Sequence, residues 1–249
     1  MQNVTKSYSK RLAGRLVKVC IIGDSHVGAL KKAWAVIDRT FPGIRITFFA
    51  LPALALDSVV AANGTLCSVS EGDRKALEFI SGGKSHIDPG EYDVFLVYGC
   101  GARATFASAG HFYSQAVQEK AMLDLVEGSL SFKLLTRLRT ITDKPVFVGH
   151  NPLAAAKKIE SGSSPDAYIS GMEMLNRLIY RPLAAQILMQ PMTTIVNGRA
   201  TGLEFSKGSR RLSIGGRFDD KAHPEADINH MNEEFGKIWL MDFFKILLA

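Results

Sequence analysis

The chain of 249 residues contains only three cysteines, and they are widely spaced. Cys20, Cys67 and Cys100 cannot form a complete set of disulfide bridges, and none belongs to a C-x-x-C pair. Reduced thiols are the simplest interpretation, which favours a cytoplasmic protein. The six histidines show no metal-ligand spacing with cysteines or carboxylates, so we expect no metal and no cofactor.

Long apolar runs are missing as well. No stretch reaches the roughly eighteen apolar residues that a membrane-spanning helix needs. Residues 1–15 are polar and basic without an apolar core, so we expect no secretory signal and interpret them as a flexible arm. Residues 16–249 are long enough to bury one sizeable core and are predicted to form a single domain without a membrane partner.

Positive charge exceeds negative charge, and the formal net charge is +6. The basic residues are dispersed, with small groups near the N-terminus and at 207–211. Because no aromatic-basic motif accompanies them, we predict no nucleic-acid partner and interpret the excess as surface solvation. A hydrophobic content of 47% and a charged content of 22% are ordinary for a soluble globular protein.

Apolar runs of strand length alternate with segments of helical periodicity along the chain. The predicted strands are 16–22, 44–50, 93–98, 144–148 and 192–196, and the predicted helices are 26–39, 114–140, 166–190 and 229–248. Five strands separated by helical segments indicate an α/β fold with a doubly wound parallel sheet. Ligands of such sheets bind beyond the carboxyl ends of the strands. The turns at 23–26, 99–101 and 149–151 are therefore expected to meet at one pocket.

A serine follows the first predicted strand, in the sequence Gly23-Asp24-Ser25-His26. A serine at a strand-to-helix turn is exposed and has backbone N–H groups and the positive end of a helix dipole beside it. These groups suit a nucleophile whose reaction passes through an oxyanion. The alternative is that Asp24 and Ser25 only cap the helix, which such residues commonly do.

An acid and an imidazole lie three residues apart near the C-terminus, at Asp227 and His230. His230 is the candidate base, and Asp227 is the candidate group that orients its ring. The alternative is that Asp227 or Asn229 begins the last helix and leaves His230 in its first turn. The rival groups nearby are His223 as the base and Asp219 and Asp220 as the acid.

The strand with Gly-Asp-Ser near the N-terminus and Asp-x-x-His near the C-terminus together resemble the SGNH, or GDSL-type, hydrolase superfamily. The resemblance runs from Gly23 to about Asn232, in motifs rather than in continuous sequence. It implies a flavodoxin-like, three-layer α/β/α fold around a five-stranded parallel sheet. It also implies acyl ester chemistry, because the members are esterases, lipases, thioesterases, carbohydrate deacetylases and related acyltransferases. By this resemblance Ser25 is the nucleophile, His230 the base and Asp227 its partner.

The resemblance also implies an oxyanion hole with three donors, namely the serine N–H, a glycine N–H and an asparagine side chain. Gly64 matches the second donor. The third departs from the pattern, because Gly101 stands where the asparagine is expected. The Gly101 N–H, Arg103 or a water are alternative third donors. Asn151, which follows the next strand, is a further substitute donor or else an ordinary turn residue before Pro152.

Asp24, His26 and Arg103 are the candidate substrate contacts around Ser25. The plainer interpretations are that His26 is a first-turn helix residue and that Arg103 forms a surface ion pair. The predicted function is a serine esterase that removes an acyl group, by preference acetyl, from a carbohydrate ester or another small molecule. Two alternatives stay open: an O-acyltransferase that acts on a glycan or polysaccharide precursor, and a non-catalytic binding protein of the same fold.

Overall fold

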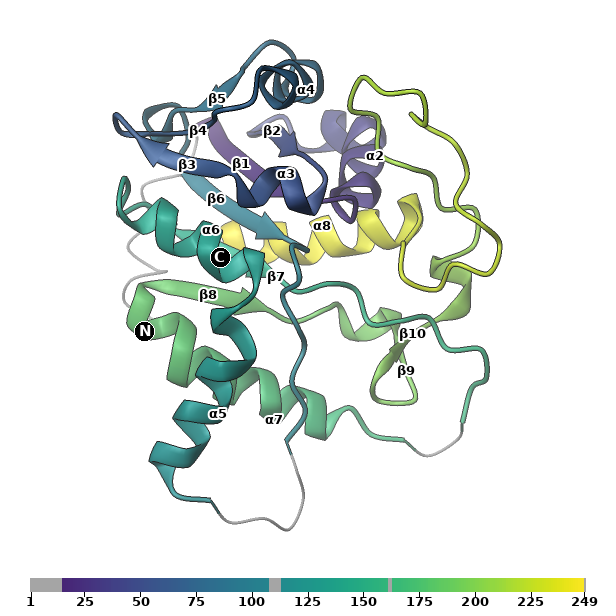
Figure 1. The fold of residues 1–249 in the computed structure, drawn as a ribbon. Coiled ribbons are helices and arrows are strands. Elements are labelled where there is room, and N and C mark those ends of the chain that lie inside the picture. Colours follow the sequence, from purple (N-terminus) through teal and green to yellow (C-terminus); the bar gives the residue numbers. More distant parts are fainter. Residues whose placement is uncertain (1–14, 108–112, 161–162, 249) are drawn as a thin grey trace.

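The computed structural model describes residues 15–107, 113–160 and 163–248 (Figure 1). The arm that we predict for residues 1–15 lies outside the described residues, except for Arg15. No helix in the described ranges is long and apolar enough to cross a membrane.

A five-stranded parallel sheet forms the centre of the molecule, in the order β2-β1-β6-β7-β8. Its strands are β2 (Ile44–Ala50), β1 (Val17–Gly23), β6 (Val94–Tyr98), β7 (Val146–Gly149) and β8 (Ala185–Leu188). Counted along the chain, this is the order 2-1-3-4-5 of flavodoxin-like sheets. The predicted α/β class and the five-stranded parallel sheet are confirmed.

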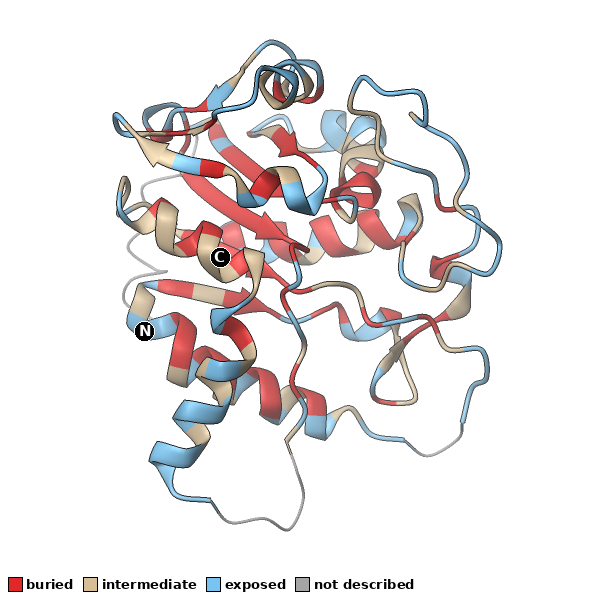
Figure 2. Cartoon of the chain, viewed as in Figure 1, coloured by how far each residue is buried: buried red, intermediate tan, exposed pale blue. Residues whose placement is uncertain are grey.

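Helices cover both faces of the sheet and complete three layers (Figure 1). Alternate residues of each strand point to opposite faces, so Phe95 and Val97 join one core cluster and Leu96 and Tyr98 the other. Figure 2 shows the strands as almost continuously buried. The first cluster includes residues of α6 (Leu130–Arg139) and α7 (Asp166–Leu175), and the second includes residues of α2 (Val27–Ile37) and α8 (Glu233–Leu248).

The predicted strand at 192–196 was wrong, and the fifth strand is β8, inside the range predicted as the helix 166–190. Pro182 lies in the 3₁₀ turn Arg181–Leu183, and the helical segment that follows α7 ends at Ala184, whose φ is 51°. The buried Asn176 side chain then bonds both the N–H and the C=O of Ile187, at 2.8 and 2.7 Å. This side chain holds a strand of only four residues in register.

Two predicted helices have different bounds in the structure. The helix predicted over 114–140 is two helices, α5 (Gln115–Glu127) and α6, and the Ser129 hydroxyl caps the second by accepting the Phe132 N–H at 3.3 Å. The last helix begins at Glu233 rather than near Asn229.

The remaining strands form small antiparallel sheets. One sheet contains β3 (Val59–Ala62), β4 (Thr65–Ser68) and β5 (His86–Ile87), and it is flanked by α3 (Ala53–Asp57) and α4 (Glu71–Ser81). The other is the pair β9 (Ile195–Val196) and β10 (Ala200–Thr201). Gly64 lies in the tight turn between β3 and β4, where its φ of 75° suits a hairpin turn.

Candidate active site

The turns that follow β1 and β6 are joined at the carboxyl edge of the sheet by the Asp24 carboxylate. Its Oδ2 accepts the Cys100 N–H at 2.9 Å, and its Oδ1 accepts the His26 N–H at 3.1 Å. A buried carboxylate needs such donors, and Asp24 is only 9% exposed. Both oxygens thus serve the backbone, and a contact of Asp24 with substrate stays a prediction.

The turn after β6 has an unusual backbone, in which Gly99, Cys100 and Gly101 all have positive φ values. A Cβ atom added to Gly99 would lie 2.5 Å from Asp24 Oδ1. Glycine at this position therefore permits the close approach of the two turns. This backbone places the Cys100 N–H against the Asp24 carboxylate and the Gly101 N–H against the turn after β7.

Ser25, His230 and Asp227 form a continuous hydrogen-bonded chain. Ser25 Oγ lies 2.9 Å from His230 Nε2, and His230 Nδ1 lies 2.8 Å from Asp227 Oδ2. A carboxylate only accepts, so it holds the proton of His230 on Nδ1 and leaves Nε2 free to accept the serine proton. Ser25 is exposed at the beginning of α2, and its N–H has no hydrogen-bond partner among the described residues.

Local backbone groups hold the Asp227 carboxylate in place. Its Oδ1 accepts the N–H groups of Asn229 and His230 at 2.8 and 3.1 Å. Burial alone would raise the pKa of Asp227, but these two donors and the His230 ring outweigh it and lower the pKa to about 2. Asp227 is thus ionised at neutral pH. The N-terminus of the last helix belongs to Asn232, whose Oδ1 accepts the Phe235 N–H at 3.1 Å.

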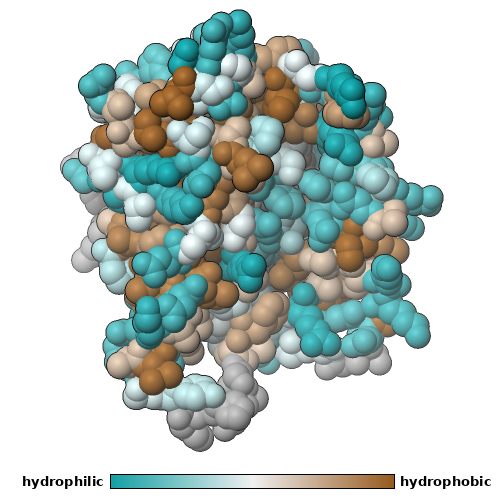
Figure 3. All heavy atoms as spheres, in the orientation of Figure 1, coloured by the Kyte–Doolittle hydropathy of each residue, from teal (hydrophilic) through white to brown (hydrophobic). Residues whose placement is uncertain are grey.

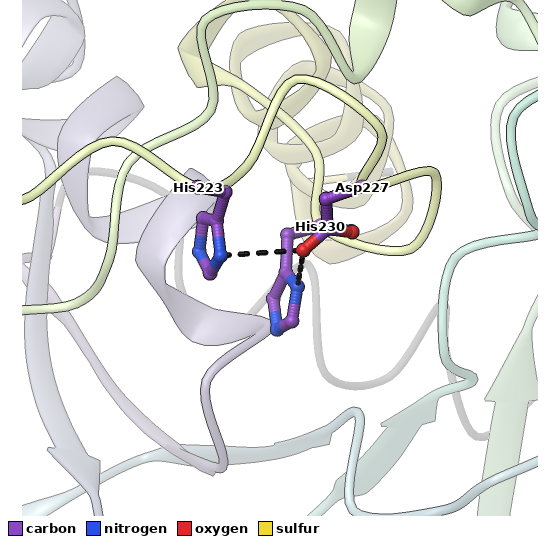
Figure 4. A group of neighbouring side chains, drawn as sticks. All are labelled: His223, Asp227 and His230. Carbon is purple, nitrogen blue, oxygen red and sulfur yellow. Dashed lines mark hydrogen bonds and ion pairs between the residues drawn. The ribbon is translucent and has the colours of Figure 1, made fainter.

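The His230 ring lies between two other imidazoles. The His26 ring is stacked on it with centroids 5.0 Å apart, and the His223 ring with centroids 4.0 Å apart and an interplanar angle of 10°. His223 Nδ1 also lies 3.3 Å from Asp227 Oδ2, as Figure 4 shows. Sequence reasoning proposed His26 as a substrate contact and His223 as a rival base, and the structure places both against His230.

Both outer histidines are held in the neutral form. Burial lowers the pKa of His26, although Asp24 opposes the change. Burial also lowers the pKa of His223, and positive charge on His230 lowers it further. The two rival acids are engaged elsewhere, because Asp219 accepts the N–H groups of Ile214 and Gly215 and Asp220 pairs with Lys32 and Arg210.

His223, Asp227 and His230 also bring two imidazoles and a carboxylate within 4.8 Å of one another, a donor set that zinc accepts. The ring geometry does not suit chelation. The lone pair of an imidazole nitrogen lies in the plane of its ring, and one ion beside two stacked rings, with centroids 4.0 Å apart and planes inclined by 10°, cannot lie in both planes. The arrangement fits two rings that share one carboxylate.

Two of the predicted oxyanion donors are placed differently from expectation. The Gly101 N–H donates to Asn151 Oδ1 at 3.1 Å, so it is not free for an oxyanion. Gly64 lies at the tip of a hairpin whose Leu66 pairs with Ile87, which precedes β6 in the chain. That hairpin runs toward the amino edge of the sheet (Figure 1), so the structure does not bring Gly64 to Ser25.

Asn151 follows β7 and lies against the turn after β6, where the resemblance leads one to expect an asparagine. Its Oδ1 is fixed by the Gly101 N–H, and its side-chain nitrogen has no hydrogen-bond partner among the described residues. The Asn151 backbone is held in turn by His150, whose Nδ1 contacts the Asn151 carbonyl oxygen. These contacts leave the carboxamide N–H groups as available donors beside the turn after β6.

Sequence reasoning missed the buried network that supports Asn151. His150 Nε2 lies 2.7 Å from the Tyr168 hydroxyl, which also accepts the Gln190 N–H at 2.7 Å. Burial lowers the pKa of His150 to about 4, so the ring is neutral at neutral pH. These residues come from β7, α7 and the end of β8, and nothing in their local sequence signals that they meet.

A polar segment, residues 207–225, covers the start of α2. Leu212 packs over Gly28, where an added Cβ atom would lie 3.4 Å from Leu212 Cβ. The side of the molecule that this segment forms is mainly hydrophilic (Figure 3). A pocket of about 180 Å³ lies within it and is lined by Ser206, Lys207, Gly208, Ser209, His223, Pro224 and Glu225. Arg103 is exposed beside the turn after β6, and its contact with substrate stays a prediction.

No protein-family model matches the sequence, and no match to a curated protein is found. Among solved structures, the periplasmic domain of the Salmonella ser. Paratyphi A lipopolysaccharide acetyltransferase aligns with a TM-score of 0.47 and 11% identity, over 100% of this chain and 97% of that chain. BT4096, a gut microbial diltiazem-metabolizing enzyme, aligns with a TM-score of 0.32 and 12% identity, over 72% of this chain and 38% of that chain. Similarity at this level carries no information about the reaction of this chain.

Proposed function

We propose that the protein is a serine ester hydrolase that removes an acyl group from an oxygen ester. The observation that carries the proposal is the hydrogen-bonded chain from Ser25 through His230 to Asp227, with contacts of 2.9 and 2.8 Å. A hydroxyl, an imidazole and a carboxylate in this order are the parts that nucleophilic acyl transfer requires. The exposure of Ser25 leaves the hydroxyl open to a substrate.

The reaction has two halves. Ser25 Oγ attacks the ester carbonyl while His230 Nε2 takes its proton, and Asp227 stabilises the imidazolium that forms. His230 then gives this proton to the departing alkoxide, which leaves an acyl-enzyme on Ser25. In the second half, His230 takes a proton from a water that attacks the acyl-enzyme, and it returns this proton to Ser25 Oγ as the bond between Oγ and the acyl carbon breaks and the acid leaves.

The oxyanion of each tetrahedral intermediate has two candidate donors. They are the Ser25 N–H, which is free and lies at the positive end of α2, and the carboxamide nitrogen of Asn151. Asn151 thus supplies from the end of β7 the amide that the resemblance places after β6. The Asn151 carboxamide would thus replace the side-chain donor that Gly101 lacks.

A carbohydrate bearing a small acyl group, by preference acetyl, is the proposed substrate. The hydrophilic surface around the segment 207–225 suits an alcohol rich in hydroxyl groups (Figure 3). The polar pocket beside His223 offers hydroxyl, ammonium and carboxylate groups to such a ligand. Arg103 is the candidate contact for an anionic group on the substrate.

Transfer of the acyl group to a glycan hydroxyl is the second candidate function. The exposed Ser25 and the polar pocket favour it, because an acceptor sugar needs open access to the acyl-enzyme. Incubating p-nitrophenyl acetate with and without sugar acceptors distinguishes the two functions. An O-acetylated sugar that forms only with the enzyme indicates transfer, and acetate alone indicates hydrolysis.

The central test compares the wild type with Ser25→Ala by fluorophosphonate labelling and by p-nitrophenyl acetate hydrolysis. We expect Ser25→Ala to abolish labelling and to lower kcat by at least about 10³-fold, because the acyl-enzyme has no other nucleophile. Ser163→Ala is the matched control, since Ser163 is exposed and lies outside the site. Equal labelling of the wild type and Ser25→Ala would rule out the proposed nucleophile.

A further inference from the structure

His223 separates a solvent-accessible pocket from the Asp227–His230 pair. One part of its surface lines the pocket in the segment 207–225, and its ring face is stacked on His230. The side chain is only 8% exposed, although His230 is 24% exposed. His223 therefore lies between this pocket and the pair, whose side chains are 16% (Asp227) and 24% (His230) exposed.

The contact with His230 involves the face of the His223 ring more than its nitrogen. The two rings are nearly parallel, at 10°, with centroids 4.0 Å apart. Asp227 Oδ2 is bonded to His230 Nδ1 at 2.8 Å and lies 3.3 Å from His223 Nδ1. His223 Nδ1 is thus a second group close to this oxygen, beside the bond to His230.

His223 fits this role only as a neutral ring. The charged and titratable groups that face it are His230 and Asp227 from the segment before α8, Arg211 from the segment 207–225, and His26 from the turn before α2. Burial lowers the pKa of His223, repulsion from a protonated His230 and from Arg211 lowers it further, and Asp227 opposes them. The neutral ring is then an apolar surface against which the imidazolium of His230 forms.

We propose that His223 is a positioning residue, which covers one face of His230 and keeps water from the Asp227–His230 pair during proton transfer. The inference rests on the proposed function, in which His230 takes the proton of Ser25. Exclusion of water strengthens the attraction between a carboxylate and an imidazolium, because the local dielectric constant falls. The stacked His223 ring also restrains the His230 ring from turning away from Ser25.

Two substitutions separate the ring from its nitrogen atoms. His223→Phe keeps a flat ring over His230 and removes both nitrogens, whereas His223→Ala opens the pocket onto the Asp227–His230 pair. We expect His223→Phe to keep kcat within about threefold of the wild type. We expect His223→Ala to lower kcat by about 10- to 100-fold with KM within about twofold, because the base loses its position. His86→Phe, at an exposed position of β5, is the control.

A second measurement does not depend on esterase activity. The His230 proton on Nδ1 gives a low-field NMR resonance when it is shielded from exchange with water. We expect this resonance in the wild type and in His223→Phe, and we expect its loss through exchange in His223→Ala. Circular dichroism and thermal unfolding verify that each variant is folded, and His223→Leu replaces the phenylalanine variant if that variant does not fold.

Two results would overturn the inference. The first is a His223→Ala variant with the kcat and the NMR resonance of the wild type, because water would then have no effect on the pair. The second is a folded His223→Phe variant that loses as much activity as His223→Ala, because a nitrogen would then be the essential group. If the wild type has no esterase activity, the proposed function fails, and the NMR comparison still decides the role of His223.

Discussion

The Asn151 side chain connects the ends of β7 and β6, because its Oδ1 accepts the Gly101 N–H. Its side-chain nitrogen has no hydrogen-bond partner within the described part of the chain. We expect Asn151→Ala to lower kcat by about 10²- to 10³-fold, since this is the usual effect of losing one oxyanion donor. KM should change little, because the donor acts on the transition state more than on the bound ester. Steady-state hydrolysis of p-nitrophenyl acetate measures both constants.

The control for this prediction is Asn63→Gly, which changes an asparagine in the β3–β4 turn and suits the positive φ of 51° there. We expect wild-type kcat for this variant. A folded Asn151→Ala enzyme with wild-type kcat would remove Asn151 from the oxyanion hole and return attention to Arg103 or a water.

The residues of the proposed triad were predictable because each motif is local. Ser25 follows a strand within a few residues, and Asp227 and His230 are three positions apart. The structural role of Asp24 was not predictable for the opposite reason, because its partner Cys100 is 76 positions away in the sequence. The same limit hid the stacking of His26 on His230, whose segments are far apart in the sequence. The stacking of His223 on His230 depends on the conformation of the loop that contains both residues.

Helix α2 follows Ser25, and helix α8 follows Asp227 and His230. The two helices pack closely at Gly236. A Cβ atom on Gly236 would lie 2.2 Å from the Ala29 carbonyl oxygen. Gly236→Ala should therefore lower the free energy of unfolding by about 1–3 kcal/mol, because a packed interface has no room for the added methyl group. Urea unfolding followed by circular dichroism measures the change.

Gly72 in α4 is the matched control for Gly236, since it is also a helical glycine. Its added Cβ atom would meet nothing closer than Ser70 Oγ at 3.7 Å, which is ordinary contact. Gly72→Ala should raise the free energy of unfolding by about 0.4–1 kcal/mol through the reduced entropy of the unfolded chain. A loss of stability in both variants would contradict the contact argument.

Long, strongly patterned elements were predictable, and short ones were not. The strand 44–50 is correct to the residue, because it is an apolar run after a Pro-Gly turn. β8 was missed because its four residues are too few to show a strand pattern, although Pro182 lies just before them. The bonds from the Asn176 side chain to the Ile187 backbone fix the position of this short strand. No periodicity in the sequence predicts such bonds.

The whole molecule should lose stability as the pH falls, and His150 is one named cause. The pKa of its buried ring is lowered to about 4 in the folded protein, whereas an unfolded histidine has a pKa of about 6.5. The unfolded chain thus binds a proton between these values that the folded protein does not. The His150 contribution should lower the free energy of unfolding by about 3 kcal/mol from pH 6.5 to pH 4 and then level off.

Urea unfolding of the wild type and His150→Gln at pH 7, 6 and 5 tests this linkage. Glutamine does not titrate, so we expect a smaller decline of the unfolding free energy with falling pH in the variant. The constant difference between the two proteins at pH 7 reports the lost bond to Tyr168. Parallel pH curves for the two proteins would show that His150 is not the group responsible.

The doubly wound parallel sheet, and the meeting of three turns at its carboxyl edge, followed from general rules about parallel sheets. Alternating strands and helices predict a doubly wound sheet, and ligands of such sheets bind at the carboxyl edge. The turns after β1, β6 and β7 do meet there, through the Asp24–Cys100 and Gly101–Asn151 bonds. The rules do not specify which groups of those turns bond to one another. The Gly101 N–H was therefore expected to be available to an oxyanion, but it donates to Asn151 Oδ1.

Ser25 and His230 are 205 positions apart in the sequence, and this separation has a consequence during protein synthesis. A ribosome that adds about 5–20 residues per second makes the serine roughly 10–40 s before its base. The nascent chain during that interval carries a hydroxyl of ordinary reactivity, since no imidazole is present to activate it. The proposed esterase thus gains its reactivity only after residues 227–230 have been made and packed, and a translation product that stops earlier is harmless to the esters of the cell.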